Sequence, residues 1–435
     1  MNFDQAQSAR SAPTLLNAQE REKVLAKVSS AVGKHFYDVD LRTNHWPVAV
    51  AKHRARIVGA ATDEEFEVSM QALLAELKRS HVGFFHESLS RSSSKMVLCA
   101  TYMASKTSDG ERWVFQDVHE GGPASLAGIH PGDVLLNVDG RDFYPPEHPL
   151  FPVEATVALN VLTMGLRQET KTVIIPAAKR IRGQLPQVMP SPVVSHKKLA
   201  HEIGYVRIAT YPGKVGVEVA NEISRAVQDL GGVDRMIIDL RGNTGGGIGV
   251  LRAMSLLTPG RLPIGRYVDG TMAPVNGAKG YHMVFDRIPE RKRDLIPLAI
   301  KFPVVISIRK AIGLKTPILI TTEGLDEMPF HGRIVLLVDR HTASANEMLV
   351  SFAREHKLAT VVGEATPGRV LGGNKFALSR GYWLALPVGS YQSKDGEVLE
   401  GHPIEPDVRS PFDPDSARAG VDTQLNRAIE VVLGL

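Results

Sequence analysis

The chain has 435 residues, too many for one ordinary hydrophobic core, so its length predicts two or three domains. Hydrophobic residues make up 43% and charged residues 23%, a balance typical of folded globular proteins rather than disordered ones. The 51 Lys and Arg residues barely exceed the 47 Asp and Glu residues, which argues against a nucleic-acid-binding surface.

Cysteine content and the distribution of apolar residues predict the compartment. Cys99 is the single cysteine, so an internal disulfide is excluded and no oxidising compartment is required. The first residues lack a basic segment followed by an apolar stretch, and the longest apolar runs, such as 334–338, are far short of a membrane span. We therefore expect a cytoplasmic protein without a membrane segment.

Residues 1–94 are predicted to form an N-terminal helical region. Within it, Thr62-Asp-Glu-Glu65 fits the capping box that begins a helix. Apolar residues then recur at helical spacing, at Phe66, Met70, Leu73, Leu74 and Leu77. The cations Lys78 and Arg79 suit the end of this helix.

Residues 95–178 change to short strands separated by turns. Strands are predicted at 96–102 and 113–118, on either side of a Ser-Asp-Gly turn at 108–110. The stretch 120–140 contains Gly-Gly-Pro, a short helical segment, Pro-Gly-Asp, a strand and Asp-Gly, and it resembles a PDZ module. One departure is that no glycine-rich carboxylate-binding loop precedes Met96.

Residues 179–203 are rich in Pro and Lys without a clear period and are predicted to be a linker. From 204 to 435, strands and helices alternate, which predicts an α/β core and a multidomain α/β protein. Its strands are expected at 205–209, 235–240, 334–338, 359–362 and 382–386. Residues from about 270 to 328 do not alternate, and we interpret them as an insertion that forms a helical lid.

The glycine-rich segment 239–249 follows a predicted strand of this core. It reads Asp-Leu-Arg-Gly-Asn-Thr-Gly-Gly-Gly-Ile-Gly, and its consecutive glycines expose backbone N–H groups to an anion or a carbonyl oxygen. A phosphate site is one alternative, but no Gly-Lys-Ser/Thr follows, and Val250 stands where a dinucleotide-binding motif needs its last glycine. A plain tight turn is the other alternative.

A second segment places Ser344 between a strand and a helix. The strand 334–338 precedes it, and apolar residues at helical spacing follow it, at Ala345, Met348, Leu349, Phe352 and Ala353. A serine on such a turn is exposed near the positive end of the helix, as a nucleophile requires. The alternative is that Thr342 or Ser344 is only the N-cap of the helix.

A third segment consists of 363–369 and the acidic loop 395–407. By itself its pattern predicts only turns.

In this order, the three segments resemble peptidase family S41, the tail-specific and carboxyl-terminal processing proteases. The resemblance extends from the N-terminal helices to Asp407 and implies a crotonase-like core of stacked β-β-α units. In that family the middle serine of a Ser-Ala-Ser-Ala-Ser-Glu run is the nucleophile, and here Ser344 occupies that place in Thr-Ala-Ser-Ala-Asn-Glu. The resemblance then implies an oxyanion hole made by the N–H groups of Ala345 and of Gly245 or Gly246.

The general base distinguishes two branches of this family. The processing proteases use a lysine in a Thr-x-Gly-Lys-Gly turn, but this chain has Arg369 there, and arginine cannot accept a proton. A second branch, similar to the core of the tricorn protease, uses a Ser-His pair and a downstream glutamate. Ser80 and His81 fit the pair and Glu400 fits the glutamate, so we expect His81 to be the base, oriented by Ser80 and Glu400. The alternative is that His81 is an ordinary histidine near a helix end.

Neither a metal nor another cofactor is expected. The segment His201-Glu-Ile-Gly-Tyr205 lacks the second histidine of an H-E-x-x-H zinc motif, and paired cysteines are absent from the sequence.

The resemblance implies a serine endopeptidase that cleaves unfolded or flexible polypeptides through an acyl-enzyme on Ser344. We expect polypeptide substrates and neither nucleic-acid nor membrane partners, and we leave a homo-oligomer open. The rival hypothesis is a non-catalytic S41-like or PDZ protein that binds peptides or small hydrophobic ligands. The two hypotheses differ in whether Ser344 and His81 come within hydrogen-bond reach.

Overall fold

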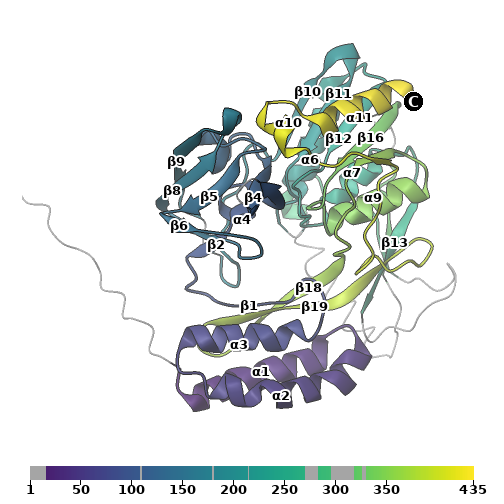
Figure 1. Ribbon diagram of the computed structural model, residues 1–435. Helices are drawn as coiled ribbons and strands as arrows, with labels where there is room; N and C mark the ends of the chain where they lie inside the picture. The colour runs from purple at the N-terminus through teal and green to yellow at the C-terminus, as the bar shows by residue number, and fades with distance from the viewer. Residues whose placement is uncertain are drawn as a thin grey trace, which may run out of the picture. The chain divides into compact units, whose positions relative to one another are not determined.

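The computed structural model describes residues 16–107, 110–178, 181–213, 215–269, 283–294, 318–325 and 330–435. The chain divides into two compact units (Figure 1): unit 1 is Met1–Ser88 with Gly373–Val388, and unit 2 is Leu89–Gly372 with Gly389–Leu435. Both units combine helices and strands, so the α/β class predicted from the sequence is confirmed. Strand β19 (Tyr382–Ser393) begins in unit 1 and ends in unit 2.

Unit 1 consists of helices packed against part of a six-stranded sheet. Strand β1 (Gly83–His86) pairs with β19, and β18 (Leu371–Ala377) pairs with the same strand. Rings of Phe66, Phe84 and Tyr382 meet at centroid distances of 4.9 to 5.8 Å in the core between helices and sheet. The helices are α1 (Ala18–His35), α2 (Trp46–Val58) and α3 (Asp63–Ala75), with a π-helical turn at Leu41–His45.

Helix α3 begins where the sequence predicts and ends earlier. The side chain of Thr62 accepts a hydrogen bond from the N–H of Glu65 at 3.1 Å, which caps the helix. The N–H groups of Leu77 and Lys78 donate to carbonyls three residues back, and Lys78 has φ 48°. The chain therefore tightens and leaves the helix before Arg79, because a left-handed residue cannot continue an α-helix.

The first part of unit 2 is an antiparallel sheet in the order β3-β4-β5-β8-β9, with the short β6 (Arg141–Asp142) beside β5. The predicted strand 96–102 is wrong in its first half, because Ser94–Val97 is a short helix, α4, whose Ser94 Oγ donates to the carbonyl of Ala100 at 2.6 Å. The five strands are β3 (Ala100–Thr107), β4 (Gly110–Val118), β5 (Val134–Val138), β8 (Ala155–Leu162) and β9 (Gln168–Ile175).

A further six-stranded sheet of unit 2, called the large sheet below, has the order β10-β11-β12-β16-β17-β20, and all pairs except β10 with β11 are parallel. The predicted linker 179–203 is wrong over Val194–Lys198, because these residues form β10. Its Lys197 and Lys198 are exposed, as is common on an edge strand. The other strands are β11 (Gly204–Ile208), β12 (Arg235–Asp239), β16 (Arg333–Val338), β17 (Thr360–Gly363) and β20 (Val408–Arg409).

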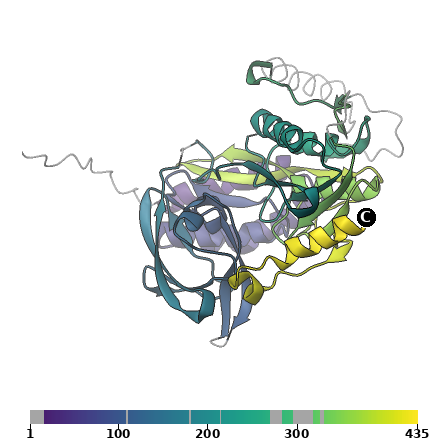
Figure 2. The ribbon, with the colours of Figure 1, turned by 90° about the horizontal axis from the view of Figure 1, so that it is seen from above.

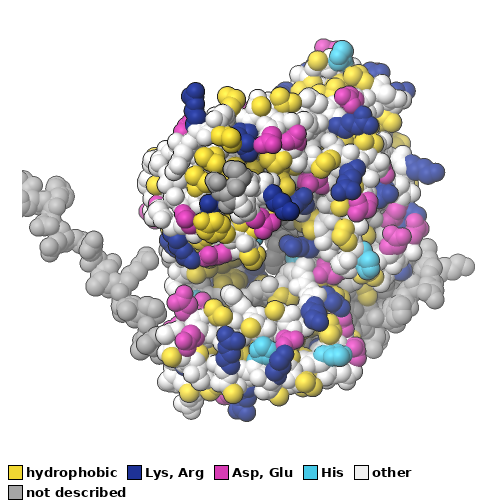
Figure 3. Space-filling model, viewed as in Figure 1, with side chains coloured by type: hydrophobic (Ala, Val, Ile, Leu, Met, Phe, Trp, Pro, Cys, Tyr) yellow, Lys and Arg dark blue, Asp and Glu magenta, His cyan; other side chains and the backbone are white. Residues whose placement is uncertain are grey.

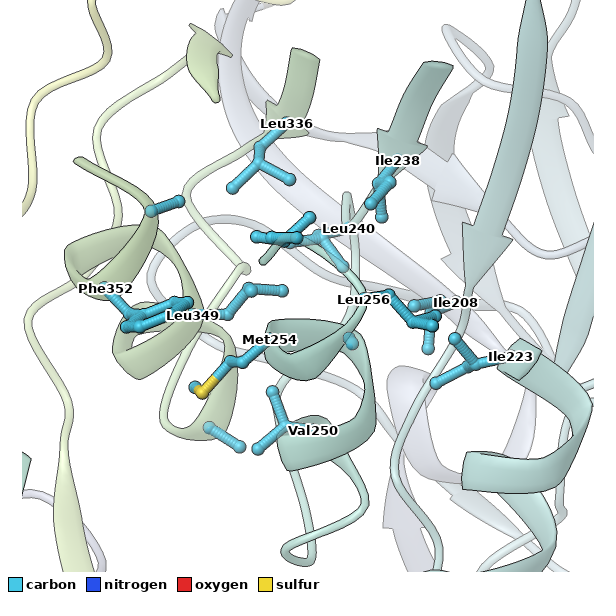
Figure 4. Close-up of a cluster of buried hydrophobic side chains, with 14 of the residues drawn as sticks. Ile208, Ile223, Ile238, Leu240, Val250, Met254, Leu256, Leu336, Leu349 and Phe352 are labelled. Atoms are coloured by element: carbon cyan, nitrogen blue, oxygen red, sulfur yellow. The ribbon is translucent and has the colours of Figure 1, made fainter. Parts of the chain in front are cut away.

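Helices cover both faces of this sheet (Figures 1 and 2). Side chains alternate along each strand, so Ile238 and Leu336 point to one face while Ile237 and Leu337 point to the other. The first face packs on α6 (Val217–Leu230), α7 (Val250–Ser255) and α9 (Ala345–Glu355), as Figure 4 shows for Leu349 and Phe352. The second face packs on α11 (Thr423–Gly434). A parallel sheet buried on both sides holds its strand ends rigidly.

The expected insertion at about 270–328 is described only in part. Strand β13 (Pro263–Asp269) precedes it and pairs with β15 (Ile318–Thr321) and with the end of β19. Strand β14 (Met283–Phe285) pairs in parallel with β15. Residues 270–282, 295–317 and 326–328 of this segment, and with them most of the expected helical lid, lie outside the described residues.

Charged side chains of both signs are interspersed on the face of the molecule shown in Figure 3, in keeping with their balanced numbers in the sequence. Among the helices that the structure describes, none is long and apolar enough to cross a bilayer.

The cap of α3 predicts a measurable loss of stability. Thr62→Ala removes the acceptor for the Glu65 N–H and should lower the free energy of unfolding by about 1 kcal/mol. Urea unfolding checks this, with Gln71→Ala as the control because Gln71 is exposed on the same helix. Equal losses in the two variants would show that the cap contributes nothing.

Candidate active site

Ser344 lies between strand β16 and helix α9, as the sequence predicts. Its backbone has φ 58° and ψ −116°, a conformation that residues with a side chain rarely adopt. The side chain is half-buried, and the residue that follows begins the helix. A sharp strand-to-helix turn with a strained serine is the arrangement that presents a nucleophile.

Glu347 holds this turn in place from within the helix. Its side chain is fully buried, and its Oε2 accepts a hydrogen bond from the Ser344 N–H at 3.0 Å. The same oxygen accepts the N–H of Arg369 at 2.8 Å. Oε1 accepts the hydroxyl of Thr366 and the N–H of Gly368, both at 2.7 Å. One carboxylate therefore joins residues 339–345, which hold the predicted nucleophile and are called the nucleophile turn below, to the 366–370 turn.

No role for Glu347 was predicted from the sequence. The sequence feature that could have revealed it is a glutamate among the apolar residues of a predicted helix. A charge buried there needs several hydrogen-bond donors. Burial raises its pKa above that of an ordinary glutamate, and the four hydrogen bonds oppose the rise.

Gly245 brings the glycine-rich turn against Ser344. It has φ 92°, and a Cβ there would lie 2.8 Å from the Ser344 Cβ and 3.0 Å from the Ala345 nitrogen, so only glycine fits. The N–H of Gly245 donates to Oδ1 of Asn243 at 2.9 Å. Among the residues that the structure describes, the N–H groups of Gly246 and Ala345 donate to no protein acceptor. Those two amides are available for an oxyanion, whereas the Gly245 amide is engaged.

Two buried polar residues join the glycine-rich turn to the nucleophile turn. Oδ2 of Asp339 accepts the N–H of Gly242 at 3.0 Å, while its Oδ1 accepts the Thr342 hydroxyl, also at 3.0 Å. The carbonyl of Asn243 accepts the Nδ2 of Asn346 at 2.8 Å. Burial raises the pKa of Asp339. These contacts lock the relative position of the two turns that would face a substrate carbonyl.

The aspartate of the Asp-Leu-Arg motif is structural. Asp239 is fully buried at the end of β12 and pairs with Arg241 at 2.7 Å and with Arg207 at 3.2 Å. Burial alone would raise the pKa of Asp239, but the two guanidinium groups hold it well below the usual range. Arg207 also pairs with Asp117 of β4, which connects the antiparallel sheet of unit 2 to this turn.

Glu400 lies beside the 366–370 turn in the same unit. It is half-buried, and its Oε2 accepts the N–H of Val370 at 3.0 Å. The side chain of Arg369 is exposed between Gly368 and Val370, which are both buried. Unit 2 thus contains Ser344, the glycine-rich turn and Glu400 on connected loops.

Ser80 and His81 belong to unit 1. Oγ of Ser80 lies 2.7 Å from Nδ1 of His81, as expected for a serine that orients the ring. His81 is exposed, with φ 60°, and a Cβ at Gly373 would lie 3.8 Å from the His81 Cβ. The predicted pair is therefore formed in unit 1, while the predicted nucleophile lies in unit 2.

No group of three or more His, Cys, Asp or Glu side chains is arranged to hold a metal ion within the described ranges. His201 and Glu202 lie in a short 3-10 turn at the edge of the large sheet.

The comparison with protein families identifies residues 202–410 with the model of peptidase family S41, so the family predicted from the sequence is confirmed for this part of the chain. A carboxyl-terminal-processing protease of Synechocystis sp. is 25% identical over 294 residues, which are 66% of this chain and 56% of that protein. This chain therefore spans little more than half of that relative's length.

Two solved structures share the fold. The photosystem II D1 C-terminal processing protease has a TM-score of 0.56 at 19% identity, over 95% of this chain and 97% of that chain. The tricorn protease has a TM-score of 0.51 at 15% identity, over 95% of this chain and 37% of that chain. At these identities the likeness is one of fold.

Burial of Glu347 predicts a pH dependence of stability. Because the pKa of Glu347 is raised in the folded state, protonation of its side chain stabilises the fold. This contribution to the free energy of unfolding is fully present below the pKa of an unfolded glutamate and is lost as pH rises through the raised pKa. The unfolding free energy of the wild type minus that of Glu347→Gln should therefore decrease as pH rises above the range in which an ordinary glutamate loses its proton. Urea titrations at several pH values measure this difference, and a constant or rising difference would contradict the assignment.

Proposed function

With its residues 202–410 matched to peptidase family S41, we propose that this chain is a serine endopeptidase with Ser344 as its nucleophile. The observation that carries the proposal is the strained backbone of Ser344 on the turn from β16 to α9. Strain of this kind persists only where surrounding contacts fix it, and here Glu347 and Gly245 do so.

The oxyanion of the tetrahedral intermediate is assigned to the N–H groups of Gly246 and Ala345. Gly245 has another role, because its amide is bound to Asn243 and its missing side chain lets the turn approach Ser344. Each oxyanion donor contributes about 3 kcal/mol to catalysis in comparable enzymes. The N-terminus of α9 adds a favourable dipole for the developing negative charge.

His81 is proposed as the general base, with Ser80 and Glu400 as orienting groups. One support is the 2.7 Å contact between Ser80 Oγ and His81 Nδ1. The other is that Arg369, which stands where related proteases have a lysine base, keeps its proton and cannot be the base. The connectivity of the chain also supports it. A Cβ at Gly373 would lie next to the His81 Cβ, and Gly373 follows Arg369 by only four residues. The Arg369 amide donates to the same Glu347 oxygen as the Ser344 amide.

The reaction follows from these roles. His81 takes the proton of the Ser344 hydroxyl, and Oγ attacks the carbonyl carbon of the peptide bond. The tetrahedral intermediate then collapses to an acyl-enzyme, while His81 gives its proton to the leaving amine. A water molecule, deprotonated by His81, attacks the ester carbonyl. His81 then returns this proton to the Ser344 Oγ as the second tetrahedral intermediate collapses and the carboxylic acid product leaves.

The substrate is proposed to be an unfolded or flexible polypeptide. The sheet β3–β9 is proposed as a PDZ-like module whose edge strands accept an extended peptide as an added strand. Helix α4 stands directly before β3, in place of a glycine-rich loop, so recognition of free carboxyl ends is expected to be poor. The crotonase-like description of the core, the cytoplasmic location and the homo-oligomer remain hypotheses.

Loss of the nucleophile tests the proposal. Ser344→Ala should abolish hydrolysis of an unfolded protein such as casein and leave the unfolding free energy within about 1 kcal/mol of the wild type. The matched control is Ser351→Ala on the same helix, where the hydroxyl bonds only Glu355 among described residues. Undiminished hydrolysis by Ser344→Ala would refute this assignment.

The base is tested by ranking three variants. His81→Ala should lower kcat by several orders of magnitude, because members of a catalytic triad act as a unit. Glu400→Gln should cost less, and Arg369→Ala least. For the wild type, kcat/KM should rise with pH across the range in which an ordinary histidine loses its proton. His45→Ala, an exposed histidine of unit 1, is the control. A fatal Arg369→Ala together with a benign His81→Ala would eliminate the histidine mechanism.

A further inference from the structure

The turn at 366–370 is anchored at almost every residue. The N–H of Thr366 donates to the carbonyl of Ile404 at 3.1 Å, and the carbonyl of Gly368 accepts the N–H of Gly401 at 2.7 Å. The N–H of Val370 donates to Glu400, and those of Gly368 and Arg369 donate to Glu347. A turn with so many partners is rigid, so the Cα of Arg369 has a fixed position.

That position is beside the nucleophile. The amide nitrogens of Arg369 and Ser344 lie 2.8 and 3.0 Å from the same oxygen atom of Glu347, so they are close neighbours within unit 2. The side chain of Arg369 is exposed, while Gly368 packs against 402–403 and Val370 is buried. The guanidinium is therefore the exposed end of a residue whose backbone is fixed at the candidate active site.

Arg369 differs in its pairing from other arginines near the candidate active site. Arg207 pairs with Asp117 and Asp239, Arg241 with Asp239 and Asp422, and Arg340 with Glu364 at 2.8 Å. The guanidinium of Arg369 makes no ion pair or hydrogen bond with any residue for which the structure gives a position. A permanently charged planar fork of five donors, fixed beside a nucleophile, matches the two oxygens of a carboxylate.

We propose that Arg369 is a specificity-determining residue that binds a carboxylate of the polypeptide substrate near the scissile bond. This inference rests on the proposed peptidase function and adds a substrate class to it. The carboxylate belongs to an Asp or Glu side chain within a few residues of the cleaved bond, or to the end of the chain. Arg369 takes no part in proton transfer, because it stays protonated.

The test measures peptide binding in the inactive background Ser344→Ala. Fluorescence anisotropy compares a peptide carrying Glu beside the scissile position with the same peptide carrying Gln, and each peptide is used as acid and as amide. The Glu peptide should bind about fivefold more tightly, the size expected of one partly exposed ion pair, and added salt should reduce the difference. Arg369→Gln should abolish the preference, and Arg369→Lys should retain only part of it, because an ammonium keeps the charge but lacks the fork that matches both carboxylate oxygens.

Each outcome decides one question. A preference between acid and amide alone would assign the carboxylate to the chain end. Equal affinities for all four peptides, no binding at all, or a preference unchanged by Arg369→Gln would overturn the inference. In the catalytically intact background, Arg369→Gln should raise KM for the Glu peptide only. An equal fall of kcat for the Glu and Gln peptides would instead place Arg369 on the reacting atoms and contradict it.

Hydrolysis by the wild type separates this inference from the proposed function. Cleavage without a preference for carboxylates would reject the role of Arg369 and leave the peptidase intact. A preference in binding without cleavage of any peptide would leave Arg369 in a binding site and reject the peptidase. Thermal unfolding of Arg369→Gln and Arg369→Lys provides the control for folding, since both changes are at an exposed side chain.

Discussion

The buried carboxylate of Glu347 is the interaction on which the candidate active site depends. It accepts four hydrogen bonds, from Ser344, Thr366, Gly368 and Arg369, and so joins a helix N-terminus to a turn about twenty residues later in the chain. Burying a charge is costly unless donors surround it, and here the donors are three backbone amides and the hydroxyl of Thr366. The site is therefore shaped by the requirement to satisfy one carboxylate.

The fold supplies the rigidity that this arrangement needs. The large parallel sheet is covered by helices on both faces, so the ends of β12 and β16 have little freedom, and the glycine-rich turn and the nucleophile turn follow directly from them. The side chains of Asp339 and Asn346 then cross-link the two turns. A strained serine persists only when its surroundings fix it in this way. Within this rigid site, the amide of Arg369 is bound to Glu347 and its side chain is exposed.

Much of this was predictable from the sequence, and the failures have physical causes. Periodicity predicted the strands that precede both turns, and the position of Ser344 followed from a strand pattern that changes to a helix pattern. The local pattern wrongly predicted one strand over 96–102, where the chain begins with helix α4 and the Ser94 hydroxyl donates to the backbone carbonyl of Ala100. It also missed the edge strand β10 at 194–198, where charged residues hide the strand pattern. The role of Glu347 depends on contacts with residues distant in sequence, and the engagement of the Gly245 amide depends on a side-chain bond, so neither follows from spacing.

The central claim is that Glu347 holds Ser344 as the nucleophile. The most direct measurement is the rate at which a fluorophosphonate forms an adduct, with the modified serine mapped by peptide mass spectrometry in the wild type and in Glu347→Gln. The account predicts an adduct on Ser344 in the wild type and at least a tenfold slower reaction in a folded Glu347→Gln variant, as expected when the geometry of a catalytic group is lost. An adduct on another serine, or an equal rate in both proteins, would contradict it.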